Sequence, residues 1–180
     1  MVFELDLQRG YQAKASVPAN VRFELLSADK VQHLFEVTQY LSQDEARHRI
    51  AEGHLCIAGY VDGIPAYSSW LALGPVRVDY LDVTVVPGPA AAFSYEVYVA
   101  PFSRCLGLAK FGVDFRARLL REGGVQRCFS VVVPENQAGL AHTLACGFRP
   151  IGRAYCLRLG GFERFWFRKS SESVPLRFET

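Results

Sequence analysis

The chain has 180 residues, of which 50% are hydrophobic and 13% aromatic, and its formal net charge at pH 7 is +2. This length and apolar content are enough for one domain with a substantial core, and they exclude a disordered chain. The near-neutral charge gives no reason to expect a nucleic-acid or membrane partner, and no apolar run approaches the ~20 residues of a membrane span. We therefore predict a single domain over 1–180.

The ends of the chain and its cysteines favour a cytoplasmic protein. The opening MVFELDLQRG contains acidic residues and no long apolar stretch, unlike a secretory signal. We interpret 1–20 as an N-terminal arm and 171–180 as a polar C-terminal tail. The odd cysteine count and the absence of a C-x-x-C pattern favour reduced, structural thiols and no metal site. The five are Cys56, Cys105, Cys128, Cys146 and Cys156.

The first predicted elements are a strand and two helices. The segment VRFELL (21–26) has the pattern of a strand, and Ser27 precedes apolar residues at helical spacing. A second helix is predicted after Ser42, which forms a capping-box pattern with Glu45, and it ends at Gly53.

Strands are predicted through the middle of the chain. Two apolar strands within 55–73 are joined by Asp62-Gly63, a pair typical of hairpin turns. A further strand is expected over 76–86, followed by the breaker PGPAAA. The segment SYEVYVAP (94–101) predicts another strand that ends at its proline.

Helices and strands alternate in the remaining sequence. Apolar residues from Leu108 onward recur at helical spacing, which predicts a helix that Gly123 ends. After it we expect a strand, a short helix capped by Asn136, and two final strands, over 127–133, 136–147, 151–159 and 162–167. These elements predict a mixed α/β fold, with one sheet and helices on both of its faces.

The stretch FSRCLGLAKFG (102–112) joins a predicted strand to the longest predicted helix. Small residues Gly107 and Ala109 would let a ligand approach the backbone, and Arg104 adds a positive charge. The first amides of a helix have no partner within the helix and lie at the positive end of its dipole. The turn therefore suits a phosphate or pyrophosphate group, although a plain strand-to-helix turn would also use a glycine here.

The order of motifs around this turn resembles the GNAT family of acyl-CoA N-acyltransferases. Val99 and Pro101 match a V-x-P pattern, and 104–109 matches the family signature Q/R-x-x-G-x-G/A at the start of its central helix. Asn136 and the pair Gly147-Phe148 match a later N…G-F segment of the family. The resemblance extends roughly over 21–167 and is strongest from 94 to 149.

The resemblance implies a mostly antiparallel central sheet that binds acyl-CoA between two splayed parallel strands, here 94–99 and 127–133. The strand backbone at Val97, Tyr98 and Val99 would pair with the pantetheine arm, and Asn136 would contact the pantetheine or the adenosine. An amide at the Val99 end of the strand would stabilise the oxyanion. The pyrophosphate would be bound by the side chain of Arg104 and by the amides of Cys105, Leu106, Gly107, Leu108 and Ala109.

The resemblance also implies roles in proton transfer. Glu96 lies in the strand beside the expected thioester and is the candidate general base; the alternative is a carboxylate paired with a neighbouring arginine. Many members have a tyrosine that protonates the leaving thiolate where this chain has Thr143. Threonine is a poor acid, so a bound water or the adjacent His142 would have to replace it, unless His142 is an ordinary helix residue.

The implied function is an N-acyltransferase that uses acetyl-CoA or another acyl-CoA as co-substrate, without a metal. The acceptor would be an amine on a small molecule or peptide, and the protein a monomer or homodimer. Two alternatives stay open. An acyl carrier protein would replace CoA if Arg116, Arg118 and Arg121 formed a basic docking patch. The departure at Thr143 also admits a CoA-binding or partner-binding domain without catalysis.

Overall fold

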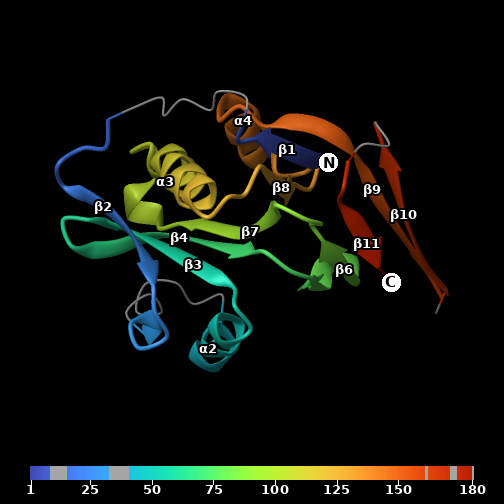
Figure 1. Cartoon of the computed structure of the whole chain (residues 1–180), viewed down its shortest axis with the longest axis horizontal. Helices are drawn as coiled ribbons and strands as arrows, with labels where there is room; N and C mark the ends of the chain where they lie inside the picture. Colours follow the sequence, from blue (N-terminus) through green and yellow to red (C-terminus); the bar gives the residue numbers. More distant parts are fainter. Residues whose placement is uncertain (9–15, 33–40, 161, 171–173, 180) are drawn as a thin grey trace.

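The computed structural model describes residues 1–8, 16–32, 41–160, 162–170 and 174–179. Its main feature is an eight-stranded mixed sheet with the strand order β10-β9-β1-β8-β7-β4-β3-β2 (Figure 1). Neighbouring strands are antiparallel except for β7 and β8, which are parallel. The strands are β1 (Val2–Asp6), β2 (Val21–Leu26), β3 (Leu55–Val61), β4 (Ile64–Ala72), β7 (Ala91–Val99), β8 (Arg127–Val131), β9 (Arg149–Leu159) and β10 (Phe162–Lys169).

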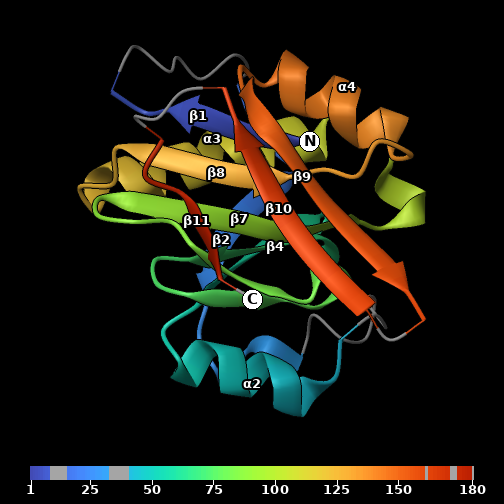
Figure 2. The ribbon, with the colours of Figure 1, turned by 90° about the vertical axis from the view of Figure 1, so that its right-hand side faces the viewer.

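Different layers cover the two faces of this sheet (Figures 1 and 2). The helices α3 (Leu108–Glu122) and α4 (Gln137–Ala145) lie on one face, which we call the α3 face. The helix α2 (Gln43–Ala51) lies on the opposite face, which we call the α2 face. The predicted fold class, a mostly antiparallel sheet with one splayed parallel pair and helices on both faces, is confirmed.

The N-terminal arm predicted over 1–20 is wrong for its first residues. β1 pairs with β8 and β9 in the interior of the sheet. Phe3 and Leu5 are buried in the cluster that includes α3, and Val2 is buried on the other face. Glu4 is buried as well, and its carboxylate accepts hydrogen bonds from Arg149 Nε and Nη2 at 3.0 and 2.8 Å. The arm was predicted from the weak periodicity of 1–20, and a strand of only five residues at its start contributes little to such a pattern.

A second, smaller sheet replaces the single strand predicted over 76–86. That segment contains β5 (Val76–Val78), a 3-10 turn (Asp79–Leu81) and β6 (Val83–Val86), with Asp82 in the left-handed region at φ 54°. β6 also pairs with β11 (Arg177–Glu179), so the tail predicted over 171–180 contains a strand. The buried residues Val174 and Leu176 pack with this sheet against the main one.

Several local predictions are confirmed. Asp62 and Gly63 both have positive φ, 52° and 82°, as the tight turn between β3 and β4 requires. Ser42 Oγ accepts a hydrogen bond from the amide of Glu45, which caps α2. The helix expected after Ser27 is helical at 31–32, and its continuation over 33–40 lies outside the described residues. No described helix combines the length and apolar character needed to cross a membrane.

The termini of several strands differ from the prediction, and β9 and β10 are each two residues longer than the predicted 151–159 and 162–167. β7 begins at Ala91, inside the segment PGPAAA that was interpreted as a breaker, because only its first part contains prolines. A short 3-10 turn (Pro101–Ser103) then separates β7 from the loop before α3. β8 ends at Val131, two residues before its predicted end.

Candidate functional site

The two parallel strands in the middle of the sheet pair over only four residues. Their register runs from Ala91 opposite Arg127 to Ser94 opposite Ser130. No further pairs between β7 and β8 occur in the described part of the chain. The backbone edge of β7 beyond Ser94 therefore has no strand beside it on the β8 side, and it is available to an extended ligand.

A β-bulge in β7 marks the position where the strands separate. Tyr95 pairs with Trp70, and Tyr98 pairs with Ser68, so Glu96 and Val97 together lie opposite Ser69 alone. Glu96 adopts φ 47°, a left-handed conformation that is unfavourable for a residue with a side chain. Bulges of this kind bend a strand and redirect its side chains, and they are frequent next to active sites.

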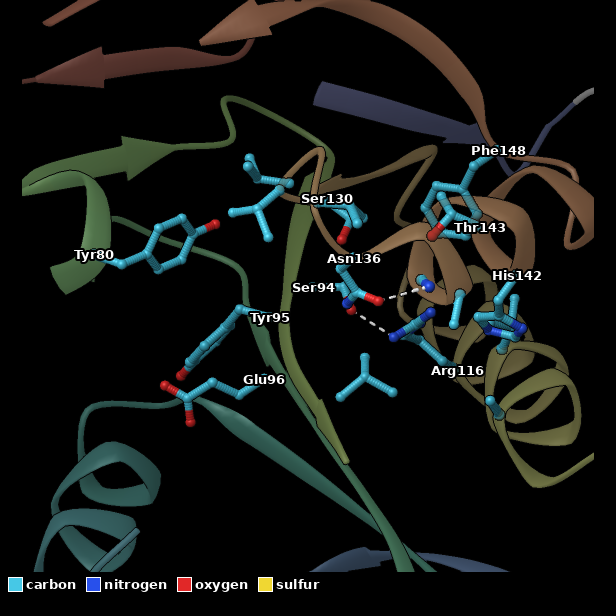
Figure 3. A pocket seen from close by; sticks show the side chains of 18 residues that line it. Tyr80, Ser94, Tyr95, Glu96, Arg116, Ser130, Asn136, His142, Thr143 and Phe148 are labelled. Atoms are coloured by element: carbon cyan, nitrogen blue, oxygen red, sulfur yellow. Dashed lines mark hydrogen bonds between the residues drawn. The ribbon is translucent and has the colours of Figure 1, made fainter. Parts of the chain in front are cut away.

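A cavity of about 630 Å³ occupies the gap between the two strands. It is lined from the α3 face by α3 and α4, and from the α2 face by Tyr80 of the 3-10 turn (Figure 3). β7 contributes a run from Ser94 to Val97, and β8 contributes Ser130 and Val131. Because residues from both faces line the same space, a ligand chain entering between the strands could meet a second ligand within it.

The turn before α3 provides backbone donors at one end of this region. Gly107 is the N-cap residue at φ 77°, and Cys105 also has a positive φ of 66°. Within the described residues, the amides from Cys105 to Ala109 donate no backbone hydrogen bond, whereas those of Lys110 and Phe111 bond to the Gly107 carbonyl. Arg104, Cys105 and Leu106 are exposed, and Ala109 lines the cavity. These features fit an anionic group.

On the α2 face, charged side chains are paired with one another. Arg49 donates from Nη1 to Glu96 at 2.6 Å and from Nε to Glu45 at 2.9 Å. Its guanidinium carbon lies 5.4 Å from the ring centroids of both Trp70 and Tyr95. Burial alone would lower the pKa of Arg49, but the two carboxylates outweigh it and raise the pKa. The cation is therefore permanently charged, and it fixes the position of the Glu96 carboxylate.

Tyr95 connects this network to His54. The Tyr95 hydroxyl lies 2.6 Å from His54 Nδ1, and their rings pack edge to face. Burial raises the pKa of Tyr95 and lowers the pKa of His54. The pair is therefore held in its neutral form near neutral pH.

On the α3 face, a buried arginine has no carboxylate beside it. Arg116 is only 3% exposed, and Figure 3 shows it reaching toward Ser94. Among the described residues its one hydrogen bond goes from Nη1 to Ser94 Oγ, and no ion pair is found. Its Nε is buried and has no hydrogen-bond partner there, and its guanidinium lies 6.0 Å from the Phe148 ring centroid.

Helix α4 places the other candidate residues on the cavity wall. Asn136 Oδ1 accepts a hydrogen bond from the Gly139 amide at 2.8 Å, so this oxygen already caps the helix. Thr143 is buried and lines the cavity beside His142. Burial, and then the charge of Arg116, lower the pKa of His142, so little of it is protonated at neutral pH.

Of the thirteen residues predicted to act in catalysis or in CoA binding, the structure brings six to one cavity and leaves seven outside its lining. Glu96, Val97, Ala109, Asn136, His142 and Thr143 line it. Tyr98 and Val99 continue β7 beyond the bulge and pair with β4, and the others belong to the turn before α3. The side chain of Leu108 is buried in the core, so only its backbone faces the turn. In the part of the chain that is described, no group of three or more His, Cys, Asp and Glu side chains is placed to bind a metal.

From the sequence, Arg116 was considered only as one of three arginines, with Arg118 and Arg121, that could form a basic docking patch. That patch is not formed as expected, because Arg116 is buried whereas the other two are exposed. A signal was present in the sequence. At three and four residues before and after Arg116 stand only glycine or apolar residues, namely Gly112, Val113, Leu119 and Leu120. On a helix these positions surround it, which places the arginine on an apolar surface.

Comparisons with known proteins find similar solved structures but no match by sequence. No protein-family model matches the sequence, and no curated protein matches it. Among solved structures, the aminoglycoside acetyltransferase AAC(6')-Iy, in complex with a CoA bisubstrate analogue, is similar with a TM-score of 0.60 and 17% identity, over 79% of this chain and 99% of that one. AAC(6')-Ih from Acinetobacter baumannii has a TM-score of 0.59 and 15% identity, over 78% and 98%.

A third similar structure is a protein whose name states no substrate. It is a GCN5-related N-acetyltransferase from Kribbella flavida, with a TM-score of 0.57 and 14% identity, and the match spans 83% of this chain and 53% of that chain. At these identities the likeness shows a shared fold.

Proposed function

We propose that this chain, whose fold is that of the GNAT acyltransferases, is an N-acyltransferase that takes its acyl group from acyl-CoA. The observation that supports this most is the combination of a split between parallel strands and a turn of unbonded amides next to the same cavity. A thioester of CoA has an extended amide-containing arm and a pyrophosphate, and these two features match the strand edge and the turn respectively.

In this proposal the pyrophosphate is bound by the amides from Cys105 to Ala109, with Arg104 alongside. The pantetheine arm pairs with the β7 backbone at Val97, Tyr98 and Val99. Asn136 contacts the arm through its amide nitrogen, because its oxygen is used by the Gly139 amide. The thioester then lies close to the bulge at Glu96, where the strands separate.

The reaction proposed is direct attack of an amine on the thioester carbonyl. The nitrogen lone pair forms the C–N bond, the electron pair of the C–S bond leaves on sulfur, and the proton lost by nitrogen ends on the thiolate. Glu96 is the candidate base, although its pairing with Arg49 makes the alternative of a structural ion pair equally concrete. An amide at the Val99 end of β7 is the candidate oxyanion donor.

For return of the proton to sulfur, we propose Thr143 with a bound water, with His142 as the alternative. His142 is mostly neutral near pH 7, because burial and Arg116 lower its pKa. A thiolate is a good leaving group, so a weak acid in this position is compatible with turnover.

The acceptor proposed is an amine on a small molecule or peptide, entering from the α2 face beside Tyr80 and Tyr95. Aminoglycoside acetyltransferases of the same fold were crystallised with sisomicin and with an acetylneamine conjugate of CoA. Acetyl-CoA is the donor expected first. Cytoplasmic location, and a monomeric or homodimeric state, remain predictions from the sequence.

The test is binding of CoA to the purified chain, followed by thermal unfolding. CoA at ~100 times its Kd adds about 2.7 kcal/mol to the free energy of unfolding, which corresponds to roughly 2–8 °C in Tm. Gly107→Asp should abolish this shift, because it places a negative charge against the pyrophosphate. Gly107→Asn is the matched control, since asparagine has the same size and tolerates the positive φ at this position. It should retain a measurable shift.

Two outcomes would contradict the proposal. One is an unchanged Tm of the wild-type chain with CoA and every acyl-CoA tried. The other is equal CoA affinity for the folded Gly107→Asp variant and the wild type, which would remove the turn from the binding site.

A further inference from the structure

The cavity contains a charge that the proposed reaction does not use. Arg116 lies 3% exposed on the α3 face, and its guanidinium has neither an ion pair nor a partner for Nε among the described residues. A buried cation without a counter-charge is costly, by several kcal/mol in general, because burial removes its hydration. Arg49, which is partly buried, reduces that cost by pairing with two carboxylates.

The groups around Arg116 are hydrogen-bond donors of the kind that bind an anion. Ser94 Oγ accepts from Arg116, so its hydroxyl hydrogen is available for another acceptor. Ser130 lies directly opposite Ser94 in the parallel register, and Thr143 of α4 adds a third hydroxyl to the lining of the cavity (Figure 3). The only lining carboxylate in the described residues, Glu96, is already paired with Arg49.

The size of the charge indicates which anion would fit. One unpaired guanidinium compensates one negative charge, and its planar fork matches the two oxygens of a carboxylate. His142 adds no further positive charge near neutral pH, since burial and Arg116 lower its pKa. A carboxylate is therefore favoured over a phosphate dianion.

The position of Arg116 indicates which substrate would carry this carboxylate. It lies on α3, the helix whose first amides are proposed to bind the pyrophosphate, about 12 Å further along the helix axis at 1.5 Å per residue. Ser94 and Ser130 stand where the strand gap closes. A chain that enters between the strands thus reaches this point with its acyl end, whereas the acceptor is expected on the α2 face.

We propose that Arg116, Ser94 and Ser130 form a carboxylate subsite and that the preferred acyl donor is a dicarboxylic acyl-CoA. This inference rests on the proposed function and specifies its donor. The reaction is unchanged: the C–N bond forms, the C–S bond breaks with its electrons on sulfur, and the far carboxylate stays intact. The product is an amide that bears a free carboxylate.

The experiment compares the affinities of the full chain for CoA, butyryl-CoA and succinyl-CoA by calorimetry, without acceptor. The two acyl groups have the same four-carbon length and differ in the terminal carboxylate. We expect succinyl-CoA to bind about tenfold or more tightly than butyryl-CoA, as a charged hydrogen bond would give. Arg116→Gln should bring the ratio of the Kd for butyryl-CoA to the Kd for succinyl-CoA close to one. It should change the affinity for CoA itself by less than about threefold.

The matched control is Arg118→Gln, which removes an exposed arginine from the same helix and should leave the ratio unchanged. Ser130→Ala provides a second variant, should Arg116→Gln fail to fold. It should lower the ratio by about two- to threefold, the value of one neutral hydrogen bond.

The outcomes separate this inference from the proposed function. If CoA and butyryl-CoA bind but succinyl-CoA has no advantage, the donor inference is wrong and the acyl-CoA site stands. If none of the three binds, both are wrong. A further arm measures glycine against ethylamine with acetyl-CoA present. An Arg116-dependent preference for glycine, with no donor preference, would place the carboxylate on the acceptor and overturn the donor assignment.

Discussion

Two arginines, one partly buried and one fully buried, stand on opposite faces of the same strand gap, and their surroundings differ. Arg49 on the α2 face is bonded to Glu45 and Glu96 and packs against two aromatic rings. Arg116 on the α3 face is more deeply buried, yet within the described residues its guanidinium bonds only to a serine hydroxyl. Arg49 has the surroundings of a residue that stabilises the fold, and Arg116 has those of a residue that binds an anionic ligand.

The difference shows how burial and pairing must be considered together. A buried arginine by itself indicates neither structure nor function, because paired charges in a protein interior are common in both. What distinguishes Arg116 is that its guanidinium bonds to a serine hydroxyl at the wall of a cavity, whereas that of Arg49 is paired with two carboxylates. Variants of residues on the α2 face and on the α3 face can test this difference.

The largest effect is expected for Glu96→Gln on turnover. If Glu96 is the general base, its loss should lower kcat at neutral pH by about 100-fold, the usual contribution of such a group. The affinity for CoA should stay within about twofold, since the amide keeps the size of the side chain. Steady-state kinetics across pH would check this. A pH–rate profile equal to that of the wild type would leave Glu96 as the counter-ion of Arg49 alone.

The second largest effect is expected when substitutions of the two arginines are compared by their free energies of unfolding. Arg49→Met leaves Glu96 and Glu45 without their cation and should lower the free energy of unfolding by about 2 kcal/mol, a value reduced because Glu96 is 37% exposed. Arg116→Met removes an uncompensated charge and should be neutral or stabilising, within about 1 kcal/mol. Urea unfolding of both variants measures the difference. Equal destabilisation by both would remove the distinction between them.

A smaller effect is expected for Tyr95→Phe, which keeps the ring beneath Arg49 and removes only the hydroxyl. The lost contact with His54 should lower the free energy of unfolding by about 1 kcal/mol. Tyr155→Phe, in the exposed part of β9, serves as the control for loss of a hydroxyl. No difference between the two variants would show that the His54 contact does not contribute to stability.

The smallest effect is expected for the pH dependence of stability. The pKa of His142 is lower in the fold than its ordinary value of about 6.5, so the unfolded chain binds more protons once the pH falls below that value. Stability should therefore fall between about pH 7 and 5, and His142→Gln should make this fall shallower. The remaining slope includes His54, whose pKa is shifted in the same direction. A variant with the slope of the wild type would contradict a partly buried, neutral His142.

Local patterns were sufficient to predict many of the elements. The Asp62-Gly63 turn, the cap at Ser42 and the helix from Leu108 depend on contacts within a few residues, which the sequence contains directly. The Gly107 turn was predicted from the same kind of local evidence, and its positive φ agrees with the choice of glycine.

The errors fall where partners are distant in the chain. β1 was interpreted as part of an arm because 1–20 has only weak periodicity, and the burial of Glu4 depends on its pairing with the distant Arg149. β11 joins a sheet whose other strands lie more than eighty residues earlier, so nothing near Arg177 indicates a strand. The hairpin within 76–86 depends on Asp82 adopting a left-handed conformation, for which aspartate is only a weak signal.

The sequence by itself determined the order of the main elements, the turn that presents free amides and the set of residues near the strand gap, because periodicity, caps and glycine positions act locally. The tertiary structure alone decided which charges are compensated. Glu96 meets Arg49 across 47 positions of sequence, and Arg116 meets Ser94 across 22. Whether a buried charge is neutralised depends on which strands and helices pack together, and that information is distributed over the whole chain.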